Sequence, residues 1–159
     1  MAPQPARLSH SFHRGQPVGW TSRLAEWWQR WRAPRSLGQR GEKAAEKYLK
    51  RLGYRIVRRG QRSSAGEIDL IAVDDRTVVF VEVKTRVSHD KGHPSEAVDR
   101  QKQERLTRLA LAFLKRHELL EHASRFDVVA VTWPHDARQP TIEHFKNAFE
   151  PTGRGQMFS

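Results

Sequence analysis

The sequence predicts one α/β domain, because two segments with helical periodicity alternate with five segments of β-strand character. The expected order is αβββαββ, and it covers residues 36–150. A chain of 159 residues with 37% hydrophobic content has room for one such core. No apolar stretch approaches the roughly 20 residues that a membrane span requires. The pattern therefore predicts a folded domain without a membrane-spanning segment.

The first predicted helix begins after Ser36 and ends before Gly53. Serine is a favoured N-cap residue, and glycine is common directly after a helix. The apolar side chains of this segment recur every three or four residues, which is the spacing of one helical face. They are Ala45, Tyr48, Leu49 and Leu52.

Three strands are expected next, at residues 54–59, 67–73 and 77–84. The second and third are separated only by residues 74–76, with the sequence Asp-Asp-Arg, which predicts a tight hairpin. We expect the pairing of this hairpin to fix which side chains of the two strands face each other.

A polar loop follows, and Ser95 is expected to open a long helix that runs to about His117. The last two strands are expected at residues 126–132 and 141–149. Asp127 lies between apolar neighbours in the first of these strands, so we expect it to form a structural ion pair or hydrogen bond. The candidate partners are Arg125 and Arg86.

The N-terminal segment, residues 1–35, has a different composition from the domain. The first 40 residues hold seven Arg, no Lys and one acidic residue, and so carry +6 of the net charge of +11. We expect a largely disordered basic tail with a short Trp-rich amphipathic helix at about residues 21–32. That helix could dock back on the domain, bind a partner or a membrane surface, or be a targeting segment. A flexible C-terminus is expected at residues 151–159.

The composition limits the chemistry of any site. The chain has no cysteine, which excludes disulfides, thiolate zinc sites, iron–sulfur clusters and cysteine nucleophiles. Oxygen atoms or imidazoles must therefore hold any metal ion. The excess of 29 Lys and Arg over 18 Asp and Glu favours a polyanionic partner.

The hairpin predicts a pair of opposed carboxylates. If the chain turns over residues 75–76, Asp69 lies opposite Glu82 and Glu67 lies opposite Lys84. Like charges opposed on neighbouring strands destabilise a sheet unless something compensates them. A divalent cation is the simplest compensation.

Mg²⁺ or Mn²⁺ would find suitable oxygen ligands here. These are the carboxylates of Asp69 and Glu82 and the backbone carbonyl of Val83. Lys84 shares a face of its strand with Glu82, so its ammonium could orient a water molecule or help to deprotonate it. The combination indicates hydrolysis of a phosphodiester bond.

Two further charged residues continue apolar helix stripes. Glu42 precedes Ala45 by three positions on the first helix, and Lys102 precedes Leu106 by four on the long one. Such positions face the domain rather than water, and a charge there needs a partner. We expect Glu42 to support the metal ligands and Lys102 to contact the scissile phosphate. A first-turn acid and a solvated lysine are the alternatives.

The strings GEIDLIA (residues 66–72) and FVEVKTR (residues 80–86), with Lys102 and RFDV (residues 125–128), resemble the bacterial YraN family. That family is similar to archaeal Holliday junction resolvases and to the PD-(D/E)xK, or restriction-endonuclease-like, nucleases. The likeness covers about residues 38–149. One departure is Gly60, which follows Arg59 where the family usually has asparagine.

The resemblance implies a restriction-endonuclease-like core, with a central mixed β-sheet flanked by helices. It also implies catalytic roles for Asp69, Glu82, Lys84 and Glu42. Glu67 and Gln101 are expected beside the metal ligands, although Glu67 could equally form a surface ion pair with Lys84. A basic rim that follows a DNA backbone is expected from Arg58, Arg59, Arg62 and Arg86.

The sequence therefore predicts an Mg²⁺- or Mn²⁺-dependent endonuclease that acts on DNA. Branched or junction substrates are favoured by the resemblance to resolvases, with a role in recombination or repair. A homodimer would supply two active sites for two strands. The alternative is a non-catalytic nucleic-acid-binding module with a nuclease fold. We expect the bacterial cytoplasm rather than a membrane surface, and an organellar transit peptide stays open for the Arg-rich start.

Overall fold

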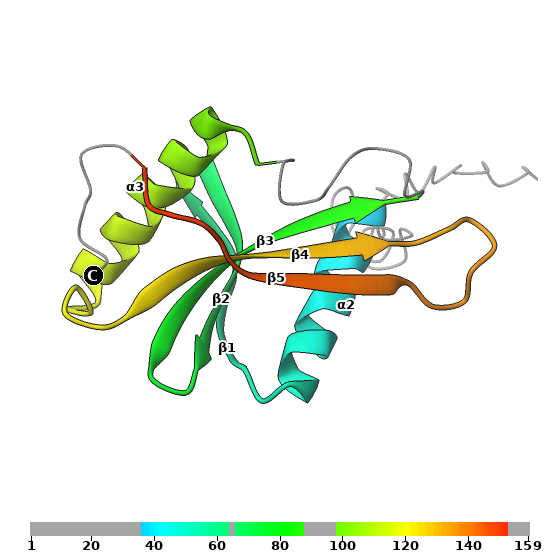
Figure 1. Cartoon of the computed structure of the whole chain (residues 1–159), viewed down its shortest axis with the longest axis horizontal. Helices are drawn as coiled ribbons and strands as arrows, with labels where there is room; N and C mark the ends of the chain where they lie inside the picture. The colour runs from blue at the N-terminus through cyan, green and yellow to red at the C-terminus, as the bar shows by residue number, and fades with distance from the viewer. Residues whose placement is uncertain (1–35, 64–65, 88–97, 153–159) are drawn as a thin grey trace, which may run out of the picture. The chain divides into compact units, whose positions relative to one another are not determined.

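A computed structural model describes residues 36–63, 66–87 and 98–152 of the chain (Figure 1). The described elements follow the expected αβββαββ order. They are α2 (Leu37–Arg51), β1 (Arg55–Ser63), β2 (Gly66–Asp74), β3 (Thr77–Arg86), α3 (Arg100–Arg116), β4 (Ser124–Thr132) and β5 (Thr141–Phe149). The predicted Trp-rich helix and most of the predicted C-terminal tail lie outside the described residues. Neither described helix is both long and apolar enough to cross a membrane.

The five described strands form one mixed sheet in the order β1-β2-β3-β4-β5. Neighbouring strands are antiparallel except for β3 and β4, which are parallel. A parallel pair needs a crossover connection, and α3 lies in that connection between β3 and β4. The α/β fold with a mixed sheet and flanking helices is thus confirmed.

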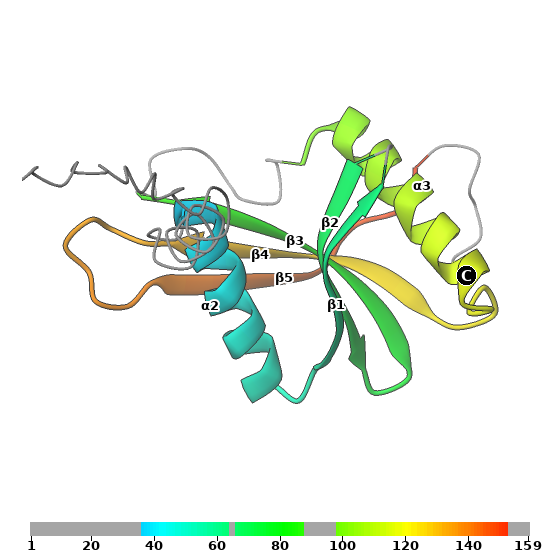
Figure 2. The ribbon, with the colours of Figure 1, turned by 180° about the vertical axis from the view of Figure 1, so that it is seen from behind.

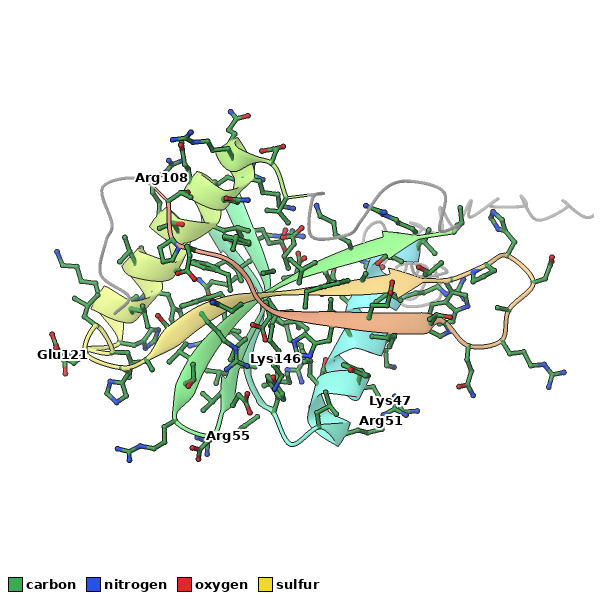
Figure 3. All side chains as sticks on the ribbon, viewed as in Figure 1. Lys47, Arg51, Arg55, Arg108, Glu121 and Lys146 are labelled. Carbon is green, nitrogen blue, oxygen red and sulfur yellow. The ribbon has the colours of Figure 1, made fainter. Side chains whose placement is uncertain are left out.

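The two helices cover opposite faces of the sheet (Figures 1 and 2). Because side chains alternate along a strand, β3 sends Phe80 into the cluster with α3 and Val79 and Val81 into the cluster with α2. Charged side chains project from the outer sides of both helices, such as Lys47 from α2 and Arg108 from α3 (Figure 3). The central strands β2, β3 and β4 are therefore buried on both faces and form the centre of the domain, whereas the edge strands β1 and β5 are partly exposed.

The start of α2 agrees with the prediction. The Ser36 hydroxyl accepts a hydrogen bond from the Gln39 backbone N–H at 3.3 Å, and the Gln39 side chain accepts one from the Ser36 N–H at 3.2 Å. This capping box satisfies two backbone donors that the helix leaves without partners. At the other end, Gly53 has φ +93°, a conformation that glycine adopts without strain.

The start of α3 differs from the prediction. The helix begins at Arg100 with Asp99 as its N-cap, whereas Ser95 was expected to open it and lies outside the described residues. The Asp99 carboxylate accepts a hydrogen bond from the Lys102 N–H at 2.7 Å. The backbone of Asp99 is extended rather than helical, so the helix does not continue towards the N-terminus. Aspartate is as good an N-cap as serine, so the residue types did not distinguish Asp99 from Ser95. The predicted start of the helix was therefore too early. The end at His117 agrees with the prediction.

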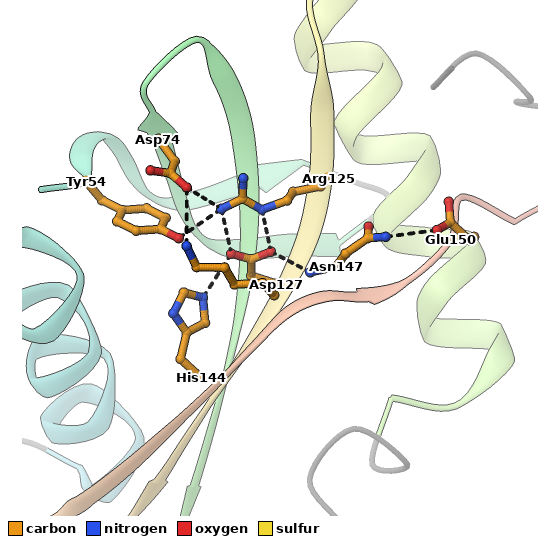
Figure 4. Close-up of polar contacts among 8 residues, drawn as sticks. Tyr54, Asp74, Arg125, Asp127, His144, Asn147 and Glu150 are labelled. Atoms are coloured by element: carbon orange, nitrogen blue, oxygen red, sulfur yellow. Dashed lines mark hydrogen bonds and ion pairs between the residues drawn. The ribbon is translucent and has the colours of Figure 1, made fainter. Parts of the chain in front are cut away.

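A buried polar network joins β4 and β5 to the end of the β2–β3 hairpin (Figure 4). Asp127 is 0% exposed and accepts hydrogen bonds from Arg125 at 2.9 Å and from the Asn147 N–H at 3.0 Å. A ring nitrogen of His144 lies 2.9 Å from its other oxygen. Arg125 also donates to Asp74 at 2.8 Å. The expected structural ion pair of Asp127 with Arg125 is confirmed.

We predict that Asp127→Asn lowers the free energy of unfolding by about 3 kcal/mol at pH 7, because it leaves Arg125 with less negative charge in a half-buried site. Burial alone would raise the pKa of Asp127, but the hydrogen bonds from His144, Arg125 and the Asn147 N–H hold it below its ordinary value. The stabilisation by this carboxylate is therefore complete above about pH 4 and is lost at lower pH. Urea unfolding at pH 7 and pH 3 checks this, and an equal loss at both values would contradict it.

Candidate functional site

The β2–β3 hairpin has the register that the sequence predicts. Asp74 pairs with Thr77, and regular pairing continues to Leu70 and Val81. Asp69 and Glu82 are the next residues on the two strands. Beyond this point β2 and β3 diverge, while β3 stays paired with β4 (Figure 1). The two predicted carboxylates thus lie where the sheet opens.

The side chain of Asp69 takes over a hydrogen bond at this opening. The Val83 backbone N–H donates to Asp69 Oδ2 at 2.7 Å. A buried backbone donor needs an acceptor, and the carboxylate supplies one where strand pairing has ended. Asp69 is therefore held against β3 one residue from Glu82 along that strand.

Glu82 is the most buried acid of the candidate site. Only 4% of its surface is exposed, and its Oε1 atom lies 3.1 Å from Lys84 Nζ. Lys102 Nζ contacts the same oxygen from α3. Two ammonium groups from different elements therefore compensate one buried carboxylate, as its burial requires. Lys102 was expected to contact the scissile phosphate of a substrate. In the structure its ammonium contacts Glu82.

The charges shift the titration of these groups. Burial and the neighbouring Glu82 carboxylate raise the pKa of Asp69 to about 6, although the Val83 N–H opposes the shift. Burial disfavours the Lys102 ammonium, but the hydrogen bond and negative charge of Glu82, together with Lys84 and the charge of Asp69, outweigh burial and raise the pKa of Lys102. The lysine thus stays charged, while Asp69 titrates close to neutral pH.

Glu42 reaches the same region from α2. Burial raises the pKa of Glu42, and the carboxylates of Glu67 and Glu82 raise it further, while Arg62 lowers it. Asp69 is also within electrostatic reach of Glu42. The structure therefore brings Glu42 close to the opening between β2 and β3, as the helix stripe predicts.

A close contact between α2 and β3 sets the position of Glu42. A Cβ atom placed on Gly41 would lie 1.8 Å from the Thr85 hydroxyl and 2.8 Å from the Thr85 Cβ. Only glycine permits this approach of helix and strand. Neither residue was predicted to have a role, although a glycine within a helical stripe is a signal that the sequence offers.

Glu67 does not have the partner that the hairpin register suggested. It forms an ion pair with Arg62 of β1 at 3.0 Å rather than with Lys84. Pairing of β2 with β3 ends at Leu70, so Glu67 stays with β1 while Lys84 moves away on β3. The suggested ion pair of Glu67 with Lys84 is therefore wrong, and a role for Glu67 beside the metal ligands stays a prediction.

The predicted basic rim falls into separate groups. Arg58 and Arg62 line a groove of about 370 Å³ together with Arg116, the last residue of α3, and His117, its C-cap, neither of which was predicted from the sequence. Arg59 instead donates two hydrogen bonds to Glu46, at 2.8 and 2.6 Å.

Arg86 was expected near DNA and Gln101 near the metal ligands, and they lie on β3 and α3 respectively. Arg86 lies at the end of β3, where its carbonyl accepts the Trp133 N–H at 2.7 Å. Gln101 is exposed in the first turn of α3. Their expected roles stay predictions.

The acidic groups suit a hard cation only in part. Among the described residues, no three His, Asp or Glu side chains are grouped closely enough to form a metal site by themselves. Mg²⁺, however, commonly uses one or two carboxylates and completes its shell with water and phosphate. Asp69, Glu82 and the Val83 carbonyl offer the oxygen chemistry that such a cation takes, Lys84 and Lys102 would compete with it for Glu82, and a metal ion here stays a prediction.

Comparison with known proteins places this site within one family. The sequence model of the family UPF0102, an uncharacterised protein family, matches residues 41–131. The chain belongs to the UPF0102 (YraN) family. The matched range contains Glu42, Asp69, Glu82, Lys84 and Lys102.

Individual UPF0102 proteins from bacteria are similar over most of their length. One from Rhodopirellula baltica is 50% identical over 74% of this chain and 72% of its own. One from Geobacter metallireducens is 45% identical over 73% of this chain and 93% of its own. One from Prosthecochloris aestuarii is 55% identical over 62% of this chain and 77% of its own. The likeness to each of these relatives thus extends over more than half of this chain.

We predict that Gly41→Ala destabilises the protein by about 1–3 kcal/mol, because the new methyl group overlaps Thr85. Urea unfolding measures the loss. Gly38→Ala is the matched control, since a Cβ there meets only the Ser36 hydroxyl, at 3.9 Å. A Thr85→Gly background should reduce the effect of Gly41→Ala, and strict additivity of the two substitutions would argue against the contact.

We predict that Asp69→Asn raises the free energy of unfolding by roughly 1–3 kcal/mol at pH 8 in metal-free buffer. The pKa of Asp69 is raised to about 6, so the stability that its protonated form contributes is complete below about pH 4 and is lost as the pH rises through 6. The gain should therefore shrink at pH 5. Denaturant unfolding at both pH values checks this, and a destabilised variant at pH 8 would refute it.

Proposed function

We propose that this UPF0102 protein is a metal-dependent endonuclease that hydrolyses phosphodiester bonds of DNA. The observation that carries the proposal is the meeting of Asp69, Glu82 and Lys84 at the point where β2 and β3 diverge. Structural acids on a solvated strand would not be buried against each other with only lysines to compensate them. The resemblance to PD-(D/E)xK nucleases supports the same assignment.

Each residue has a role that follows from its position. Asp69 and Glu82 would hold Mg²⁺ or Mn²⁺, which when bound would supply a Lewis acid for the phosphate. Lys84, fixed by Glu82 at 3.1 Å, would orient the attacking water. Lys102 balances the charge of Glu82 and lies beside it to meet an incoming phosphate. Glu42 adds negative charge from α2.

The substrate class and setting form part of the proposal. Branched or junction DNA in recombination or repair is favoured by the resemblance to Holliday junction resolvases. Two copies of the chain would place two sites on two strands. The bacterial relatives support a bacterial setting, and we propose the cytoplasm.

One observation favours a second candidate, a non-catalytic nucleic-acid-binding module. In the structure, both Lys84 and Lys102 contact the same oxygen of Glu82. Cations that already neutralise this acid would weaken the binding of a metal ion there. The module would then use the fold for shape recognition alone.

A cleavage assay separates the two candidates. Full-length protein, Asp69→Asn and Lys84→Ala are incubated with labelled linear, single-stranded, flap and four-way-junction DNA in Mg²⁺, Mn²⁺ or EDTA. We expect cleavage by the wild type only with metal, and a loss of at least about 100-fold in both variants. Arg76→Gln, which removes an exposed hairpin charge, is the control and should cut normally.

The outcomes are distinct. Equal cleavage by the wild type and Asp69→Asn would reject this site as the catalytic centre. Binding of DNA by all variants with no cleavage under any condition would replace the endonuclease by the binding module.

A further inference from the structure

A second basic feature lies on the outer side of α2, away from the candidate site. A groove of about 520 Å³ runs between α2 and the connection from β4 to β5. Its lining contains five cationic side chains and no acidic one. The cations are Arg40, Lys43, Lys47, Arg51 and Arg138.

The spacing of these residues places them on one face of the helix. Arg40, Lys43, Lys47 and Arg51 follow each other at intervals of three or four, while the buried positions of α2 are Gly41, Ala45 and Leu49. At 100° per residue, Arg51 lies on the side of the helix opposite Glu42. Lys47 and Arg51 project outward from α2 (Figure 3). One helix therefore separates the candidate catalytic site from the groove.

The groove cations lack acidic partners within the described part of the chain. The acid next to them on α2, Glu46, is already engaged by Lys50 at 2.6 Å and by Arg59 at 2.6 Å. Like charges four residues apart destabilise a helix, as Lys43, Lys47 and Arg51 must do here. An external polyanion would remove that cost.

Trp133 connects the groove to the strand that carries the candidate site. The guanidinium of Arg40 lies 4.1 Å from the Trp133 ring centre, and the indole N–H donates to the Ala137 carbonyl at 3.0 Å. The Trp133 backbone N–H donates to the Arg86 carbonyl at the end of β3. The groove is thus joined by a backbone hydrogen bond to the end of the strand that carries Glu82 and Lys84.

We propose that this groove binds the phosphate backbone of a nucleic-acid segment, as a second contact separate from the cleavage site. From Arg40 to Arg51 the helix rises about 16 Å, a length over which one strand of a duplex carries about five phosphates. The contact reads charge and shape and makes no base-specific hydrogen bonds. Where the proposed endonuclease function holds, this segment is a second arm of a branched substrate.

A lipid surface fits the groove less well. A helix that lies on a membrane inserts large apolar side chains between the lipids. The large apolar side chains exposed in the described residues are Leu52, Val57 and Val87. None of these three lines the groove, whereas Trp133 is covered by Arg40. The charge and the concave shape therefore favour a nucleic acid.

The test removes three groove charges in the full-length chain. The triple variant Lys43→Gln, Lys47→Gln, Arg51→Gln keeps residues with high helix propensity on α2. The matched control is Arg76→Gln, Arg108→Gln, Lys115→Gln, which changes the net charge equally at exposed positions outside the groove. Circular dichroism and urea unfolding establish that both variants fold.

Binding is measured in EDTA by fluorescence anisotropy, with a labelled 30-base-pair duplex and a labelled four-way junction over a series of salt concentrations. We expect the groove variant to bind the junction at least about tenfold more weakly than the control variant. The slope of log affinity against log salt should fall by about 2–3 for three lost phosphate contacts. Because no cleavage is measured, an inactive wild type would reject the endonuclease and leave this test intact.

Two outcomes would overturn the proposal. Equal affinities and salt slopes for the groove and control variants would show that the groove does not contact DNA. If the groove variant binds DNA as the control does but loses binding to vesicles of phosphatidylserine and phosphatidylcholine, the groove is a membrane contact instead.

Discussion

The hydrogen bond between the Val83 N–H and the Asp69 carboxylate is the local constraint on which the site depends. It replaces strand pairing at the position where β2 turns away from β3. The Val83 N–H, which has no acceptor on the backbone of β2 there, donates to the Asp69 side chain instead. At this position, Glu82 of β3 contacts Lys84 of the same strand and Lys102 of α3. An acid at position 69 therefore shapes the backbone as well as adding charge.

Two lysines compensate the negative charge of Glu82 in this opening, but the neighbouring acids Asp69 and Glu42 still repel Glu82. The Glu82 carboxylate raises the pKa of Asp69 and of Glu42, and Glu42 adds to the shift of the Asp69 pKa, while Lys102 and Lys84 supply positive charge at a single oxygen of Glu82. A buried region with mutually repelling acids is under electrostatic stress that folding alone does not relieve. Groups of this kind are concentrated at functional sites, because chemistry requires charges that a purely structural core would avoid.

Much of this arrangement could be predicted from the sequence, because the hairpin over residues 75–76 fixes a two-residue periodicity. Counting outward placed Asp69 next to Glu82, and the stripe of the first helix placed Glu42 towards them. The count failed for Glu67, because side-chain alternation carries no information about where two strands separate. The start of α3 at Asp99 was missed because several residues in that loop are equally good caps.

The contacts between distant elements were also beyond the sequence. Nothing in the spacing of residues indicates that Gly41 meets Thr85, or that α2 and the β4–β5 connection enclose a groove. Periodicity predicts which face of an element is buried. The element that it packs against, and how closely, depends on the twist of the sheet and the path of the loops.

The irregular end of β5 has a consequence for solubility. β5 is an edge of the described sheet, where a regular strand would offer unpaired backbone groups to another chain. Its pairing with β4 shifts between Phe126 and Val128, Asn147 has φ +48°, and the Asn147 N–H is turned inward to Asp127. The hydrogen bond that satisfies a buried carboxylate thereby breaks the regular template at this edge, which protects the protein against strand-by-strand aggregation.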